Sequence, residues 1–80
     1  MHEVSLIHEV LLIANEAAEA NCITRITGIE LMIGDNLCVM PESLEFAFNF
    51  MNKGKMMEHA KLTWEICVGR EFYVSFIEGD

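Results

Sequence analysis

The chain has 80 residues, which is the length of a single small domain. Its 13 acidic residues outnumber its 5 basic residues, so the formal net charge at pH 7 is −8. This charge argues against nonspecific binding to nucleic acids and to anionic membranes, because both contacts require clustered lysine and arginine.

The first expected element is an amphipathic helix over residues 3–20, where apolar side chains recur every three or four residues. Its apolar stripe comprises Leu6, Ile7, Val10, Leu11, Ile13, Ala14, Ala17 and Ala18. A second helix is expected to begin at Pro41, because proline lacks the N–H that a first helical turn leaves unpaired. It buries Leu44, Ala47, Phe48 and Met51, leaves Asn52 in water, and ends at Lys53-Gly54.

Three segments alternate between apolar and polar residues with the period of two that is typical of β-strands. They cover residues 25–33, 61–67 and 72–77. The last two are separated by Val68-Gly69-Arg70, a gap short enough to predict a hairpin. The order helix, strand, helix, strand, strand predicts an α+β domain over residues 1–80, with two helices packed on a three-stranded sheet. The expected core comprises Leu6, Val10, Ile13, Leu31, Leu44, Phe48, Trp64, Phe72 and Phe76.

The cysteines and the terminus indicate a cytoplasmic protein. Cys22, Cys38 and Cys67 are odd in number, widely spaced and without a CxxC pair, which favours free thiols in a reducing compartment. The first residues are acidic where a secretory signal is basic. The longest apolar run near the start, residues 10–14, is far shorter than the roughly 20 residues of a membrane span.

The residues best suited to metal chemistry are Met1, His2 and Glu3. The α-amine, the amide nitrogen of residue 2 and the imidazole of His2 can close fused chelate rings on one ion. The amide of Glu3 or a carboxylate can supply a fourth donor. Such nitrogen-rich donors suit square-planar Ni(II) or Cu(II). A histidine at position 2 is equally compatible with no metal role, and His8 and His59 are expected to be ordinary surface residues.

Motifs that would indicate catalysis are absent from the sequence. It contains no glycine-rich phosphate loop, no GxSxG and no HExxH. Paired acids such as Glu16 and Glu19 fall on the polar face of the first helix, where water is their expected neighbour. We therefore expect a protein that is not an enzyme.

Several spaced motifs together resemble the HypA/HybF family of nickel-incorporation chaperones for nickel–iron hydrogenase maturation. They are Met-His-Glu at 1–3, Ile-Glu-Leu-Met-Ile-Gly-Asp at 29–35, the stretch from Val39 to Phe48 with Pro-Glu-Ser-Leu, Lys-Gly at 53–54, and residues 69–78. The resemblance covers nearly the whole chain. It implies that Met1, His2 and Glu3 bind Ni(II) for transfer, and that the partners are a HypB-type GTPase and a hydrogenase large-subunit precursor.

One feature departs from that family. Its members carry a zinc module, built on two CxxC pairs, between the last two strands, whereas here Cys67 is followed almost directly by Gly69-Arg70. The module is thus predicted to be absent between about residues 67 and 70, and no structural zinc is expected. The alternative function is a metal-independent interaction module that docks to maturation partners. Self-association through exposed apolar residues such as Phe46 and Phe50 is left open.

Overall fold

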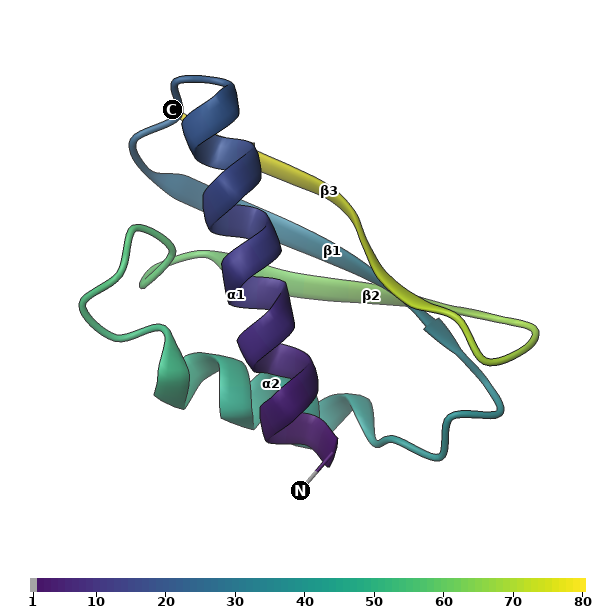
Figure 1. The fold of residues 1–80 in the computed structure, drawn as a ribbon. Coiled ribbons are helices and arrows are strands. Elements are labelled where there is room, and N and C mark those ends of the chain that lie inside the picture. The colour runs from purple at the N-terminus through teal and green to yellow at the C-terminus, as the bar shows by residue number, and fades with distance from the viewer. Residues whose placement is uncertain (1) are drawn as a thin grey trace.

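The structure is a computed structural model that describes the backbone of residues 2–80 and the side chains of residues 3–80. Its elements are α1 (His2–Ala20), β1 (Ile26–Gly34), α2 (Pro41–Met51), β2 (Lys61–Cys67) and β3 (Phe72–Gly79). Both helices lie on the same face of a three-stranded sheet (Figure 1). The α+β class and the order of elements are therefore confirmed. In the described part of the chain, neither helix is long and apolar enough to cross a membrane.

The sheet has β1 at its centre, with β2 on one side and β3 on the other. β2 runs parallel to β1, as expected of strands joined by a helical crossover, and β3 runs antiparallel to it. The predicted final hairpin is wrong in its pairing, because β2 and β3 each bond to β1 and not to one another. A short gap limits how far apart two strands lie, but it does not decide which strand lies between them.

The connection between β2 and β3 passes over the end of β1 and is fixed there by hydrogen bonds. The N–H of Gly34 donates to the carbonyl oxygen of Glu71 at 2.6 Å, and the N–H of Asn36 to that of Gly69 at 2.8 Å. Asp35 Oδ1 accepts the N–H of Gly69 at 3.0 Å. A Cβ at position 34 would lie 2.7 Å from the nitrogen of Glu71, too close for any residue but glycine. These hydrogen bonds of Gly34, Asp35 and Asn36, here called the clasp, hold the four-residue connection between β2 and β3 against the end of β1.

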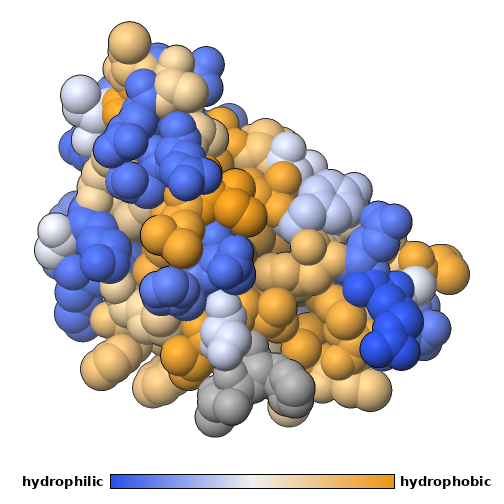
Figure 2. All heavy atoms as spheres, in the orientation of Figure 1, coloured by the Kyte–Doolittle hydropathy of each residue, from blue (hydrophilic) through white to orange (hydrophobic). Residues whose placement is uncertain are grey.

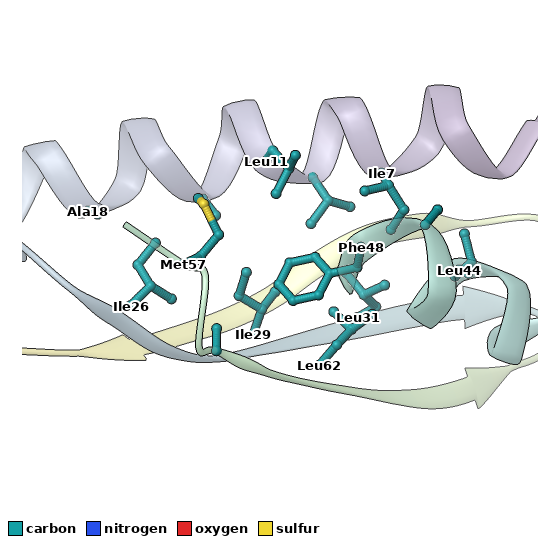
Figure 3. Close-up of a cluster of buried hydrophobic side chains, with 14 of the residues drawn as sticks. Ile7, Leu11, Ala18, Ile26, Ile29, Leu31, Leu44, Phe48, Met57 and Leu62 are labelled. Carbon is teal, nitrogen blue, oxygen red and sulfur yellow. The ribbon is translucent and has the colours of Figure 1, made fainter. Parts of the chain in front are cut away.

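The hydrophobic core fills the space between the two helices and the sheet. Figure 3 shows Phe48 of α2 between α1 and the sheet, beside Ile29 and Leu31 of β1. The buried apolar residues are Ile7, Val10, Leu11, Ala14, Ala18, Ile26, Ile29, Leu31, Ile33, Leu44, Ala47, Phe48, Met57, Ala60 and Leu62. Of the expected core, Val10, Leu31, Leu44 and Phe48 are confirmed, while Leu6, Trp64 and Phe72 are half-buried at its edge.

Two residues of the expected core are exposed instead. Ile13 is 45% exposed because it lies outside the row of α1 that faces the sheet. Phe76 is 49% exposed because a register shift in β3 changes which side chains face the core. Past that shift it is Ile77 that packs against the core. Strict alternation along β3 predicts the opposite face for both residues.

Asn52 is the clearest reversal of an expected exposure, since it is 1% exposed. Its Nδ2 donates to the carbonyl oxygens of Met57 at 3.0 Å and Glu58 at 3.3 Å. The helical period does not apply to it, because α2 ends at Met51 and Asn52 has the non-helical cap angles φ −89° and ψ 1°. Asn52 thus holds the segment that carries Met57 and Ala60 into the core.

Candidate metal centre

Two of the three predicted nickel ligands, His2 and Glu3, lie at the beginning of α1. Met1 lies outside the described residues, and His2 is described through its backbone alone, as the first residue of α1. Glu3 occupies the first helical turn and is half-buried. An acidic side chain is favourable at that position because the positive end of the helix dipole lies there.

The start of a helix leaves backbone nitrogens free for chemistry. The first four N–H groups of an α-helix have no carbonyl acceptor within the helix. Because α1 begins at His2, the amides of His2 and Glu3 are among those four. A chelate ring through two consecutive backbone nitrogens also needs both on one side of the Cα–C bond, hence a small ψ. The helical value of about −42° is much nearer to this than the extended value of about +135°.

The other histidines and the cysteines do not gather into a second centre. His8 on α1 and His59 before β2 are both exposed, as expected of surface residues. Cys22, Cys38 and Cys67 are all free thiols. Within the residues that the structure describes, no three side chains of His, Cys, Asp or Glu are grouped so that they could hold a metal ion.

A groove of about 500 Å³ opens beside Glu3, between the start of α1 and the outer face of α2. It is lined by Glu3, Val4, Glu42, Ser43, Phe46, Ala47, Phe50 and Met51. Phe46 and Phe50 are 76% and 71% exposed, which is high for so large an apolar residue. Figure 2 shows hydrophobic side chains along the lower edge of the view, where α2 lies in Figure 1.

The groove was only partly foreseeable from the sequence. Phe46 and Phe50 are four residues apart and flank the predicted buried stripe, which is a signal of an apolar helix face without a partner. Nothing in the sequence shows that Val4 and Glu3 form the opposite wall. That follows from the packing of α1 on α2, which brings Glu3 of the predicted metal motif beside this surface.

Comparison with known proteins places the chain in a family. The family model described as "Hydrogenase/urease nickel incorporation, metallochaperone, hypA" matches residues 1–72. The chain belongs to the HypA family. The resemblance drawn from the spaced motifs is thereby confirmed, and Met1, His2 and Glu3 all fall within the matched region.

Relatives in the HypA family differ in how much of their length the chain covers. The hydrogenase maturation factor HypA of Picosynechococcus sp. is 43% identical over 65 residues, which are 81% of this chain and 58% of that protein. HypA of Moorella thermoacetica is 29% identical over an alignment of 113 residues that spans both chains completely. That relative therefore carries residues that this 80-residue chain lacks.

A solved structure shares the fold. The solution structure of the Ni metallochaperone HypA from Helicobacter pylori superposes with a TM-score of 0.78, covering 96% of this chain and 96% of that chain. Sequence identity between the two is 12%, so the likeness concerns the fold alone.

Proposed function

We propose that this chain is a nickel-binding accessory protein that holds Ni(II) at Met1, His2 and Glu3 and passes it on during hydrogenase maturation. Membership of the HypA family supports the nickel-incorporation role. The observation that carries the site is that α1 begins at His2, which leaves the amides of His2 and Glu3 without helical acceptors. The proposed partners are a HypB-type GTPase and a hydrogenase large-subunit precursor, in the cytoplasm.

The chemistry of this site is binding and release, without catalysis. The amine of Met1, the amide nitrogen of His2 and its imidazole form two fused chelate rings, which leaves the position opposite the His2 amide for the carboxylate of Glu3. The amide of Glu3, which must lie beside the His2 amide, would bind in place of the amine or the imidazole. Amine and amide nitrogens must lose protons to bind nickel and regain them on release. Transfer to a partner is therefore coupled to protonation of these amine and amide nitrogens.

The test is a calorimetric titration of Ni(II) into the native chain and into the same chain acetylated at its α-amine. Acetylation removes the amine donor and with it the five-membered ring that the amine closes, so we expect nickel affinity to fall by at least about tenfold, which is about 1.4 kcal/mol. Equal affinity in the two proteins would contradict the proposed site.

A pair of substitutions separates the two donors that Glu3 offers. Glu3→Ala removes the carboxylate and keeps the amide, whereas Glu3→Pro removes both, because a proline nitrogen has no proton to lose. Proline is tolerated in a first helical turn, so the core residues of α1 stay in place. If the amide of Glu3 is a ligand, nickel binding survives Glu3→Ala and is lost in Glu3→Pro. Loss in both variants assigns the carboxylate instead.

The absence of a zinc module between about residues 67 and 70 is part of this proposal. The connection between β2 and β3 has only four residues and is held by hydrogen bonds to Gly34, Asp35 and Asn36, which supports a sheet that forms without a zinc module. We expect the chain to fold without structural zinc. Elemental analysis and a thermal melt of chelator-treated protein test this, and one tightly held zinc whose removal unfolds the chain would overturn it.

The alternative is an interaction module that docks to maturation partners without carrying metal. The exposed phenylalanines of α2 favour it, because solvent-exposed aromatic residues typically mark protein interfaces. Nickel titration separates the two functions, since an interaction module without a metal role would show no chelation at the N-terminus.

A further inference from the structure

We propose that the groove lined by Glu3, Val4, Phe46 and Phe50 seats an amphipathic helix of the protein that gives nickel to this chain or takes it away. The helix presents bulky apolar residues one turn apart, flanked by lysine or arginine. The role of that partner in nickel transfer rests on the function proposed above. The groove itself rests on its own geometry and charge.

The apolar part of the groove suits a helix. Phe46 and Phe50 are four residues apart on α2, so they stack one turn above another along its outer face. Val4, 46% exposed, contributes from α1. A helix laid along such a row inserts side chains at positions i, i+3 or i+4, and i+7, the usual pattern of helix-in-groove recognition.

The charge of the groove selects the occupant. Glu3 and Glu42 both line it, and none of the described side chains that line it is basic. Within the described side chains the one ion pair joins Arg25 to Asp80, neither of which lines the groove. With a net charge of −8 on the chain, basic residues beside the apolar face of a partner would gain attraction and correct orientation.

A second copy of this chain fits the groove less well. A two-fold interface brings the same patch of both subunits together. Glu3 and Glu42 of one copy would then approach those of the other, and like charges in a desolvated contact are destabilising. The apolar surface alone permits such a dimer, so the acidic residues are what favour a basic partner.

The position of the groove ties docking to the metal motif. Glu3 is both a proposed nickel ligand and a lining residue, and Val4 follows it directly. A helix in the groove therefore lies against the first turn of α1. Any ligand that the partner offers to nickel would be held close to the ion from the moment of docking, which favours direct transfer over release into water.

The test uses two synthetic helical peptides, labelled for fluorescence anisotropy. Both carry leucine at i, i+4 and i+7; one has lysine at the flanking positions and the other has glutamate. We expect the lysine peptide to bind at low salt, to weaken as salt rises, and to bind at least about tenfold more tightly than the glutamate peptide.

Matched variants locate the binding surface. Phe46→Ala and Phe50→Ala should each weaken the lysine peptide by about tenfold or more, as expected for aromatic anchors. Phe76→Ala removes an exposed aromatic residue of β3 outside the groove and should leave the affinity unchanged. Circular dichroism melts of all three variants check that the fold is retained.

Several results would overturn the proposal. Unchanged peptide binding by Phe46→Ala and Phe50→Ala would refute the groove as the binding surface. Equal binding of both peptides would refute the preference for basic flanking residues. A dimer in sedimentation experiments that Phe46→Ala dissociates would make a second copy the occupant. Nickel titration of Phe46→Ala keeps the two proposals apart: retained nickel binding with lost peptide binding supports both, and absent nickel binding in the native chain rejects the metal site alone.

Discussion

Replacing Asn52 tests how a single buried amide holds the segment after α2. In Asn52→Ala the hydrogen bonds from Nδ2 to the carbonyl oxygens of Met57 and Glu58 are lost. A buried hydrogen bond contributes about 0.5–1.5 kcal/mol, and orphaning its partner costs about 1–3 kcal/mol. The carbonyl of Met57 keeps its bond from the N–H of Ala60 at 3.0 Å, which reduces the penalty. We therefore expect a loss of about 2 kcal/mol.

The assay is thermal unfolding followed by circular dichroism, where about 2 kcal/mol lowers the melting temperature by about 8–16 °C in a domain of this size. Asn49→Ala is the matched control, because Asn49 is exposed on α2 and should change stability by less than about 0.5 kcal/mol. Equal melting temperatures for Asn52→Ala and the native chain would refute the assigned role of the amide.

A second variant at this position separates hydrogen bonding from packing. Asn52→Asp keeps the shape of the side chain but places acceptor oxygens against two carbonyl oxygens. Burial raises the pKa of the introduced carboxyl above its unfolded value, so the protein should gain stability as the pH falls and the group becomes protonated. If shape alone mattered, Asn52→Asp would melt close to the native chain at pH 7.

Three further outcomes follow from the structure. Phe48→Ala should cost about 3–5 kcal/mol in chemical denaturation because Phe48 is fully buried, whereas Phe46→Ala should stay within about 0.5 kcal/mol; similar losses would contradict the orientation of α2. Gly34→Ala should cost about 1–3 kcal/mol, since its Cβ would meet the backbone of the clasp, and an unchanged midpoint would count against that contact. Nickel affinity should rise between about pH 6 and pH 9 as the amine and amides deprotonate; a flat profile in calorimetry would argue against nitrogen ligation.

The fold was largely predictable because its elements have strong local signals. The stripe of α1, Pro41 at the start of α2 and the alternation in the strands each depend on residues close together in sequence. The errors arise where long-range pairing decides. A register shift in β3 places Ile77 instead of Phe76 against the core. β1 lies between β2 and β3, whereas a hairpin would have paired those two strands with each other. No local pattern encodes either feature.

The candidate site is also predictable from sequence only where its residues are close together along the chain. The proposed ligands Met1, His2 and Glu3 can be read from sequence because a chelating motif at a terminus is local, and its donors are adjacent along the backbone. The groove depends on which face of α2 meets α1, and only the packed structure joins Phe46 to Val4. The proposed metal motif and the groove share Glu3, which is a proposed nickel ligand and whose side chain lines the groove. A substitution of that side chain therefore reports on docking and on metal binding at once, which is why the peptide test relies on Phe46 and Phe50 instead.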